Sequence, residues 1–290
     1  MSAIKNVTVV GAFGTLGVPL VKALQEAGFH VTALSRAGSP STPPAGVEVK
    51  KVDYASPEAL QAALAGQDAL VSVITTTATG EHEFGINTRT VPHPGLKAML
   101  QSKIKLVDYL QEKSRENPNL TWTGICNSFF FDSIKRGSGF GFDLKTKKAT
   151  IIDSGDEPFD VATLSFVAKA VVAVLSSPDK TANRYLAVSG TVTTQNQLLA
   201  ILREETGGDW TTENVAATKC EEIGNEKMAR GTTRPSGTSC TSCSSATARA
   251  RPSRPPPTSS SASRGRMPGL PSKLSWQVYR SRLRKVALLS

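Results

Sequence analysis

Apolar and polar residues follow one another along the N-terminal part of the chain in a pattern that predicts strands and helices in turn. Short apolar runs predict strands and periodic apolar positions predict helices: strands at 6–10, 30–34, 47–52 and 69–74, helices at about 16–27 and 57–64. Pro19 falls in the first turn of one helix, Gly28 follows its end, and Ser56 and Pro57 open the other. This alternation is that of βαβ units, so the expected fold class is α/β with a doubly wound parallel sheet.

The pattern continues with a long helix, expected from about 96 to 115, and then with more widely spaced elements. These are strands at 120–126, 149–152 and 185–188, and helices at 163–176 and 196–206. The apolar positions of the long helix recur at spacings of three and four, as on the buried face of an amphipathic helix. The α/β prediction therefore extends to about residue 206.

The net charge of +10 is concentrated at the C-terminal end. Residues 231–290 contain 11 Lys and Arg and no Asp or Glu, which leaves 23 basic and 24 acidic residues in the rest of the chain. Ser, Thr, Pro, Arg and Gly dominate this tail, and such a composition buries too little apolar area to offset the entropy of ordering. We expect the tail to be disordered and, because the remainder is close to neutral, we expect no nucleic-acid partner.

Other features of the composition exclude further classes of protein. No apolar run approaches the roughly 20 residues that cross a bilayer, so no membrane segment is expected. No leader precedes the first strand, and the four cysteines form no disulfide framework, which together indicate a cytoplasmic protein. His82 and His93 lack further ligands at metal spacing, and Cys240 and Cys243 form a single C-x-x-C, so no metal site is expected.

A glycine-rich loop joins the first predicted strand to the first predicted helix. It reads Gly11-Ala12-Phe13-Gly14-Thr15-Leu16-Gly17, a G-x-x-G-x-x-G spacing. In this setting glycines let the backbone approach a pyrophosphate, and the N–H groups of the loop and the helix N-terminus bind the anion. The loop predicts dinucleotide binding by residues 11–17; the alternative is a glycine turn that binds no ligand.

The residues after the second and third strands bear on the choice of dinucleotide. NAD-binding units place an acid at the end of the second strand to hold the ribose 2′-hydroxyl, and here that position is occupied by Arg36. A guanidinium suits a 2′-phosphate, so the expected cofactor is NADP(H); the alternative is a solvated loop arginine. Asp53 is a candidate for contact with the adenine, or else a turn-forming aspartate. Thr75, after the fourth strand, completes the expected cofactor-binding set.

Further motifs resemble those of a known family. They are the run from Lys5 to Gly17, Val52-Asp53-Tyr54, Gln67-Asp68-Ala69, Glu83-Phe84-Gly85, Gly155-Asp156-Glu157-Pro158-Phe159, the run from Tyr185 to Gly190, and Thr194-Gln195-Asn196. Over residues 1–80 and about 83–229 the chain resembles the fungal NmrA-like, isoflavone-reductase-like branch of the atypical short-chain dehydrogenases/reductases. The resemblance implies a Rossmann domain that binds NADPH, a smaller C-terminal substrate domain, and reduction of C=C, C=N or C=O bonds in secondary metabolites.

On this basis three parts are expected. They are an NAD(P)-binding Rossmann domain at 1–128, a smaller substrate-binding portion at 129–229, and the disordered tail at 230–290. The family has a helix and a strand where only nine residues separate Ile74 from Phe84, and a parallel crossover needs at least about 10–12 residues. We expect the first domain to lack this helix and strand near residues 75–84. This break, and the abrupt change of composition where the tail begins, suggest errors in a gene model.

Lys103 is the predicted catalytic residue. Hydride transfer to a polarised bond needs a group that protonates or polarises the acceptor atom. Lys103 lies on or beside the apolar stripe of the long helix, where desolvation lowers the pKa of a lysine. The family's catalytic lysine stands at the matching position, so the resemblance implies the same role. The alternative is a lysine whose stem packs on the stripe while its ammonium reaches solvent.

The same helix also contains the Y-x-x-x-K spacing of ordinary short-chain dehydrogenases, in Tyr109 and Lys113. Because the helix precedes a parallel strand, its first turns lie at the carboxyl ends of the strands, where the cofactor binds. Lys113 lies ten residues beyond Lys103, roughly 15 Å further along the axis. This geometry favours Lys103 over the Tyr109–Lys113 pair.

Asn127, Phe129 and Phe159 are expected to line an apolar substrate pocket, although each could equally belong to the core. The chain is therefore predicted to be an NADPH-dependent oxidoreductase that reduces a C=N, C=C or C=O bond of a small molecule, as a monomer or homodimer. The alternatives are a non-catalytic NAD(P)-sensing regulator that acts by protein contact, as the resemblance also allows, or a defective truncated product.

Overall fold

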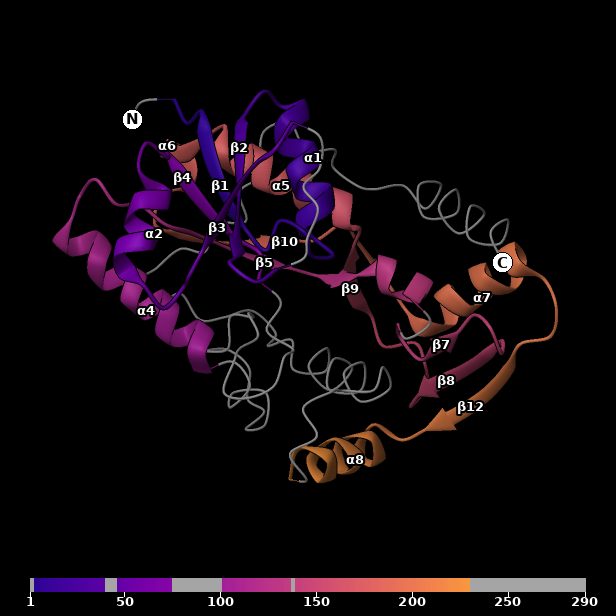
Figure 1. Cartoon of the computed structure of the whole chain (residues 1–290). Coiled ribbons are helices and arrows are strands. Elements are labelled where there is room, and N and C mark those ends of the chain that lie inside the picture. Colours follow the sequence, from indigo (N-terminus) through magenta and orange to yellow (C-terminus); the bar gives the residue numbers. More distant parts are fainter. Residues whose placement is uncertain (1–2, 40–45, 75–100, 137–138, 230–290) are drawn as a thin grey trace.

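Residues 3–39, 46–74, 101–136 and 139–229 are described by the computed structural model of the chain (Figure 1). They form a layered α/β part, which holds most of the indigo and purple ribbon, and a part of short strands and helices, which extends from it in pink and orange. No helix within these four ranges is long and apolar enough to cross a membrane.

Four parallel strands form the sheet of the first part. They are β1 (Asn6–Val10), β2 (His30–Arg36), β3 (Glu48–Val52) and β4 (Ala69–Ser72), in the order β3-β2-β1-β4. Val7 of β1 pairs with Val31 on one side and with Ala69 on the other. The strand order reverses at β1, and the crevice at such a reversal, beyond the carboxyl ends of the strands, is where open parallel sheets bind ligands.

Helices cover both faces of this sheet. They are α1 (Gly17–Glu26) and α5 (Leu164–Leu175) on one face, and α2 (Pro57–Leu64) on the other. Side chains alternate along β1, so that Val7 and Val9 pack with α1 and α5 while Val10 packs with α2. This burial on both faces explains the nearly continuous apolar runs from which the strands are predicted.

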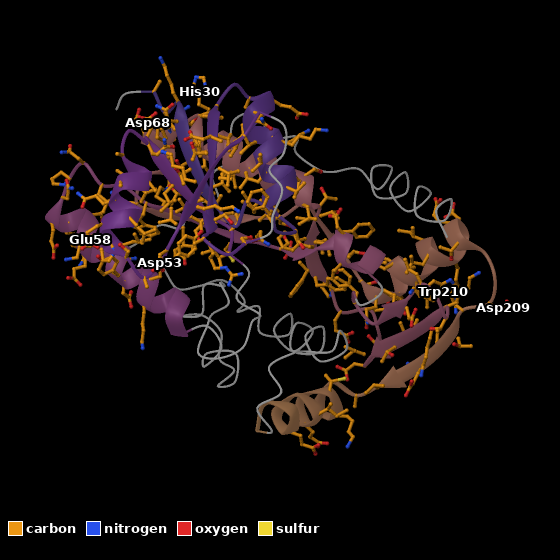
Figure 2. The ribbon with its side chains drawn as sticks, in the orientation of Figure 1. His30, Asp53, Glu58, Asp68, Asp209 and Trp210 are labelled. Carbon is orange, nitrogen blue, oxygen red and sulfur yellow. The ribbon has the colours of Figure 1, made fainter. Side chains whose placement is uncertain are left out.

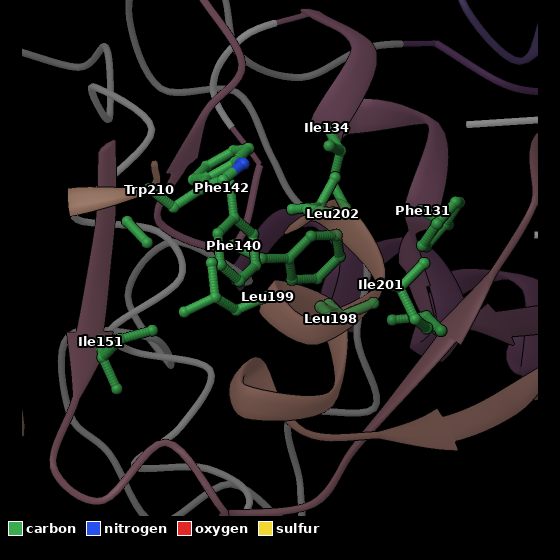
Figure 3. Close-up of a cluster of buried hydrophobic side chains, with 12 residues drawn as sticks. Phe131, Ile134, Phe140, Phe142, Ile151, Leu198, Leu199, Ile201, Leu202 and Trp210 are labelled. Atoms are coloured by element: carbon green, nitrogen blue, oxygen red, sulfur yellow. The ribbon is translucent and has the colours of Figure 1, made fainter. Parts of the chain in front are cut away.

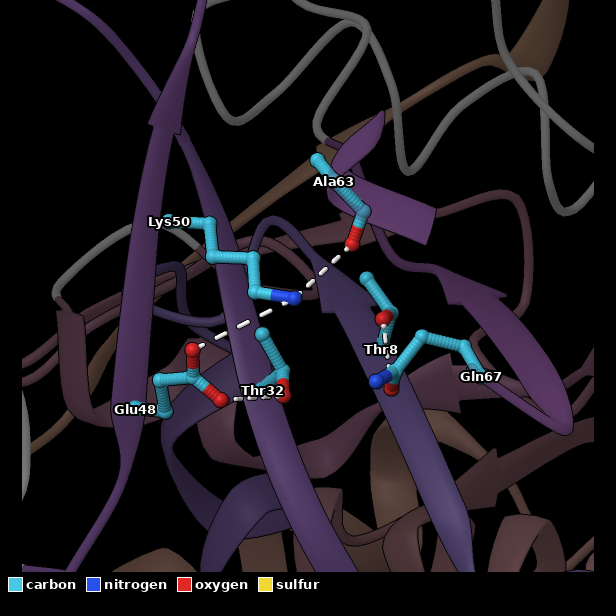
Figure 4. A network of polar contacts seen from close by, with 6 residues as sticks. All are labelled: Thr8, Thr32, Glu48, Lys50, Ala63 and Gln67. Carbon is cyan, nitrogen blue, oxygen red and sulfur yellow. Dashed lines mark hydrogen bonds and ion pairs between the residues drawn. The ribbon is translucent and has the colours of Figure 1, made fainter. Parts of the chain in front are cut away.

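The α2 face also contains polar residues whose hydrogen bonds are satisfied (Figure 4). Thr8 is fully buried in β1, and its hydroxyl donates to Oε1 of Gln67 at 2.9 Å. Lys50 donates from Nζ to the Ala63 carbonyl at 3.1 Å, at the C-terminal end of α2, and lies 4.0 Å from a carboxylate oxygen of Glu48. A cation is stabilised at the C-terminus of a helix, so these contacts help to dock α2 on the sheet.

Beyond the sheet lie α4 (Gln101–Glu116), β5 (Thr123–Asn127) and β10 (Arg184–Val188), and β5 and β10 pair in parallel. Among the described residues β4 pairs with β1 alone, and β5 pairs with β10 alone. The predicted loss of a helix and a strand near 75–84 falls outside the described residues and stays a prediction, as does the expected disorder of 230–290.

The second part contains two small sheets, in the orders β11-β9-β6 and β12-β8-β7. The strands are β6 (Phe129–Phe130), β7 (Phe142–Asp143), β8 (Lys148–Ile152), β9 (Phe159–Ala162), β11 (Thr191–Thr193) and β12 (Thr211–Val215). The remaining elements of this part are the 3₁₀ helix η2 (Phe131–Arg136) and the helices α7 (Gln195–Thr206) and α8 (Ala217–Ala229), whereas the short α6 (Pro178–Thr181) lies beside the first sheet in Figure 1.

An aromatic core lies under α7 (Figure 3). Phe131 and Phe142 are almost fully buried, and Phe142 meets Trp210 edge to face with ring centres 6.2 Å apart. Leu198 and Leu202 of α7 pack against this cluster. Such large side chains bury much apolar area per residue, which compensates for the small size of the two sheets.

The predicted α/β fold class is confirmed, and so are the strands and helices of the first sheet. In the second part the predicted helices at 163–176 and 196–206 correspond to α5 and α7, whereas β6, β7, β9, β11 and β12 were not predicted. The boundary at residue 128 stays a prediction; it falls between β5 and β6, and α5, which lies beyond it in sequence, packs on the first sheet.

Candidate functional site

The first and third glycines of the loop at 11–17 are required by the fold itself. Gly11 has a φ of 85°, a conformation that L side chains rarely adopt, and a Cβ there would lie 2.8 Å from the Val73 carbonyl oxygen of the neighbouring chain segment. A Cβ on Gly17 would overlap the Gly11 carbonyl and come within 2.6 Å of the backbone of Ala12. These two glycines permit the tight turn and the close packing of α1 on β1.

Gly14 is different, because the space beside it is open. Among the described residues a Cβ on Gly14 would meet only the Gly11 carbonyl oxygen, at 3.2 Å. The Gly14 N–H donates to that same oxygen at 3.0 Å, which fixes the turn. An open side at the middle glycine is what the close approach of a pyrophosphate needs, so the loop fits a dinucleotide.

The start of α1 adds hydrogen-bond donors to the same place. Leu16 is the N-cap residue of α1 and provides no side-chain cap, as far as the described residues show. The first N–H groups of a helix have no partner within the helix and carry a partial positive charge, so they are suited to bind an anion. Thr15 lies between this helix start and Gly14.

The loop lies where the two parts of the molecule meet. Ala12 is fully buried and Phe13 packs on the α1 side of the sheet. Leu16 packs in a cluster with Phe130 of β6 and with Ala162 of β9. The loop at the sheet's reversal is therefore next to the strands that carry the predicted substrate-pocket residues.

Arg36 ends β2 at the carboxyl edge of the sheet. Its side chain is exposed and forms no hydrogen bond or ion pair with another described residue. Tyr54 stands beside it, because its hydroxyl donates to the Leu34 carbonyl at 3.0 Å. Burial raises the pKa of Tyr54, and the nearby Arg36 charge opposes this shift. An exposed guanidinium beside an aromatic ring can bind a phosphate and an adjoining ring.

Asp53 forms a turn at the end of β3. Its Oδ1 accepts the N–H of Ala55 at 2.9 Å, which is the turn-forming role that the sequence left open. Figure 2 shows Asp53 at the opposite end of the sheet from His30 and Asp68, in agreement with the parallel strand directions. Contact of Asp53 with an adenine stays a prediction.

The predicted proton donor lies at the start of α4. The structure describes the backbone of Lys103 in the first turn of this helix, and its side chain and the whole of Thr75 lie outside the described residues. Figure 1 shows the first turn of α4 below the sheet, at the edge where the parallel strands end. The rest of the helix leads away from this edge.

The Y-x-x-x-K pair is engaged in surface contacts. Lys113 Nζ lies 2.6 Å from a carboxylate oxygen of Glu116 and 5.7 Å from the centre of the Tyr109 ring, which is itself more than half exposed. The hydrogen bond that Lys113 donates to the Glu116 carboxylate raises the pKa of Lys113. Lys113 is thus paired with Glu116 at the surface, and the choice of Lys103 over the Tyr109–Lys113 pair stays a prediction.

Two of the three predicted pocket residues come together around a third aromatic ring. Phe159 stacks on Phe140, with centres 5.3 Å apart and planes 20° apart, and Phe129 meets Phe140 edge on at 6.3 Å. Phe129 and Phe159 are half-buried, whereas Phe140 is almost fully buried. Asn127 ends β5, and its amide donates to the Ser128 carbonyl at 2.9 Å.

Tyr54 and Phe140 were not predicted as site residues. Tyr54 has a local signal, since it directly follows Asp53 at a strand end. Phe140 has none, because it adopts a φ of 60°, which is uncommon outside glycine and invisible in a periodicity pattern. Within the described residues no group of three His, Cys, Asp or Glu side chains could hold a metal ion.

Comparisons with known proteins agree with this geometry. Residues 11–114 match the model of a family described as NAD(P)H-binding. Oxidoreductase poxI of Penicillium oxalicum is 33% identical over 245 residues, which cover 78% of each chain. Among solved structures, leucoanthocyanidin reductase from Vitis vinifera in a binary complex with NADPH superposes with a TM-score of 0.71 at 14% identity, covering 98% of this chain and 99% of that one. Isoflavone reductase gives 0.63 at 15% identity, covering 84% and 87%.

Proposed function

Since the chain belongs to the isoflavone-reductase-like family of NAD(P)H-dependent oxidoreductases, we propose that it uses NADPH to reduce a C=N, C=C or C=O bond of a small secondary metabolite. One observation carries the proposal. The loop at 11–17 lies at the reversal of the sheet, with its middle glycine open, and the exposed Arg36 ends the adjacent strand.

Each part of the coenzyme has proposed partners in the chain. The backbone N–H groups of residues 11–17 bind the pyrophosphate. Arg36 binds the 2′-phosphate through two parallel N–H donors, and this contact selects NADPH over NADH. Asp53, Tyr54 and Thr75 surround the adenosine and the adjoining ribose, which is supported for Tyr54 by its position beside Arg36.

The reaction needs one hydride and one proton. The bound coenzyme supplies the hydride, which adds to one atom of the polarised bond. Lys103 donates its ammonium proton to the other atom, so that the double bond is saturated and the lysine is left neutral until solvent reprotonates it. Its place in the first turn of α4, below the carboxyl edge of the sheet, supports this role.

The substrate rests against the second part of the molecule. Phe129 and Phe159 are half-buried and lie on β6 and β9, the strands whose Phe130 and Ala162 cluster with Leu16 of the loop, and Asn127 provides a polar amide at the end of β5. A pocket of this kind is lined mainly by apolar groups with few polar ones, as is usual for small organic ligands.

Calorimetry on the purified chain tests the coenzyme. We expect NADPH to bind more tightly than NADH, and Arg36→Ala to weaken NADPH binding about 10- to 100-fold with little change for NADH. Lys22→Ala removes an exposed cation in the middle of α1 and is the matched control. If Arg36→Ala leaves the ratio of the two dissociation constants unchanged, the proposed choice of coenzyme is wrong.

Turnover tests the proton donor. NADPH oxidation is followed with a cyclic imine, an enone and a ketone, and Lys103→Ala is expected to lower kcat about 10²- to 10⁴-fold without changing the dissociation constant of NADPH. Lys105→Ala, at an exposed position of the same helix, is the control. Tight coenzyme binding without turnover of any of the three compounds would instead support a regulator that senses NAD(P).

A further inference from the structure

The end of β2 is held by hydrogen bonds on both sides of Arg36. Two residues before it, the Leu34 carbonyl accepts the hydroxyl of Tyr54 at 3.0 Å. Directly after it, the Ala37 N–H donates to the Val52 carbonyl of β3 at 3.2 Å. The backbone that carries Arg36 is therefore joined to the end of β3 twice, once through a side chain and once through the main chain.

The turn that carries Tyr54 is itself fixed to a helix. Oδ1 of Asp53 accepts the Ala55 N–H at 2.9 Å, and the Asp53 carbonyl accepts the Ser56 N–H at 3.2 Å. Ser56 is the N-cap residue of α2, and its hydroxyl accepts the Ala59 N–H at 3.2 Å. Tyr54 thus projects from a turn whose position is set by the start of α2.

The side chain of Arg36 is exposed, in contrast to its fixed backbone. Burial raises the pKa of Tyr54 and the Arg36 charge opposes this shift, so the guanidinium lies within electrostatic reach of the hydroxyl. Because the hydroxyl donates its proton to Leu34, its oxygen can still accept an N–H of a guanidinium. A neighbour that restricts an arginine before it binds an anion reduces the side-chain entropy that binding costs.

We propose that Tyr54 is a positioning residue for Arg36, so that the choice of NADPH over NADH depends on the Tyr54 hydroxyl as well as on the guanidinium. The inference rests on the proposed function, which assigns the 2′-phosphate to Arg36. Leu34 stands opposite Val10, the residue before the glycine loop, so the bond from Tyr54 holds the β2 end at a set place relative to that loop. NADH lacks the 2′-phosphate, and its binding should not depend on this bond.

Calorimetry tests the inference without turnover. Tyr54→Phe keeps the aromatic ring and removes only the hydroxyl that bonds to Leu34. It is expected to weaken NADPH binding about three- to tenfold, while the dissociation constant of NADH stays within about twofold. The same pair of results is expected for adenosine 2′,5′-bisphosphate and 5′-AMP, which are the adenosine ends of the two coenzymes.

A double variant shows whether Tyr54 acts through Arg36. In the Arg36→Ala background the group to be positioned is gone, so adding Tyr54→Phe should change the NADPH dissociation constant less than about twofold. Tyr185→Phe is the matched control. Its ring lies near the start of β10, edge to face with Trp122 at 5.8 Å, and loss of its hydroxyl should leave the binding of both coenzymes unchanged.

An unchanged ratio of the NADPH and NADH dissociation constants in Tyr54→Phe would overturn the inference. Equal weakening of both coenzymes would show a loss of structure alone and would overturn it as well, as would effects of Arg36→Ala and Tyr54→Phe that add in the double variant. Failure of the proposed function gives a different result. If the ratios change as expected but no substrate is turned over, the reductase activity is contradicted and the positioning role of Tyr54 is supported.

Discussion

The part that carries the glycine loop and the part that carries the aromatic cluster build their cores by different means. Around β1 the core consists of Val, Leu and Ala side chains, most of them from β1, α1 and β2, which follow one another in sequence, and α5 adds Ala168 and Val171. Under α7 the core combines aromatic rings with Ile and Leu side chains, and its strands are fixed by side chains such as Gln195 that bond to backbone groups 43 to 55 residues away. In the first part many similar apolar contacts contribute to stability, whereas in the second part a few polar residues such as Gln195 contribute much of it.

The largest effect should therefore come from Gln195. Gln195→Leu leaves the Ile152 N–H and the carbonyls of Phe140 and Thr150 buried without partners, and each buried unpaired group costs about 1–3 kcal/mol. We expect the free energy of unfolding in urea to fall by about 3–5 kcal/mol. Amide hydrogen exchange should rise mainly in β7, β8 and the segment around Phe140.

The control is Gln197→Leu, two residues further along the same helix. Among the described residues the Gln197 side chain makes one long hydrogen bond, 3.4 Å from the Thr193 hydroxyl, so its loss should cost less than about 1 kcal/mol. If both leucine variants unfold at the same urea concentration, the second part does not depend on Gln195 as its hydrogen bonds suggest.

In the first part, two glycine substitutions should separate folding from coenzyme binding. Gly17→Ala forces a Cβ into the backbone of Gly11 and Ala12 and should lower the free energy of unfolding by about 2–3 kcal/mol. Gly14→Ala meets only one backbone oxygen at 3.2 Å, so it should cost less than about 1 kcal/mol while still weakening NADPH binding. Similar stability losses in the two variants would contradict the different roles assigned to the glycines.

The same contrast explains what could be predicted from the sequence. In the first part the signals are local: apolar runs mark β1 to β4, and Ser56 caps α2 as expected by accepting the Ala59 N–H at 3.2 Å. In the second part β6, β9 and β11 are two to four residues long, too short for a period to be seen. Their registers depend on contacts distant in sequence, such as Val161 opposite Thr191, which no local pattern contains.

The candidate site divides in the same way. The glycine loop and Arg36 could be predicted because a phosphate site needs residue types at fixed spacing after a strand. The mutual position of Phe129 and Phe159 could not, because it depends on Phe140 and on a left-handed backbone conformation there. The sequence named two of the three rings but did not show what holds them together.

α5 packs against both parts of the molecule, and a substitution at its N-terminus should have an effect of moderate size. The Thr163 hydroxyl accepts the Phe166 N–H at 3.2 Å, and Asp132 of η2 accepts the Leu164 N–H at 2.8 Å. Thr163→Val removes the first of these bonds and should lower the free energy of unfolding by about 1 kcal/mol. Since α5 packs on both parts, we expect one cooperative transition in wild type and variant alike. Two separate transitions in circular dichroism would show that the parts unfold independently.

The smallest effect is expected at the start of β1, where an exposed carboxylate accepts hydrogen bonds from two backbone N–H groups. Oδ2 of Asp68 accepts the N–H of Asn6 at 2.7 Å and of Lys5 at 2.9 Å, and these bonds hold the pKa of Asp68 below its ordinary value of 3.8, the bond from Asn6 being the larger cause. Because the pKa of Asp68 is lower in the folded state, the carboxylate contributes its full stabilisation when the pH is above the pKa of the unfolded state. That stabilisation is lost as the pH falls through the pKa of the folded state.

Asp68→Asn should therefore lower the thermal midpoint slightly near pH 7 and near pH 5, and its difference from wild type should shrink below about pH 4. Asp209→Asn, an exposed aspartate of the second part, controls for the loss of one negative charge. A difference between Asp68→Asn and wild type that is as large near pH 3 as near pH 7 would mean that the charged carboxylate does not hold the start of β1.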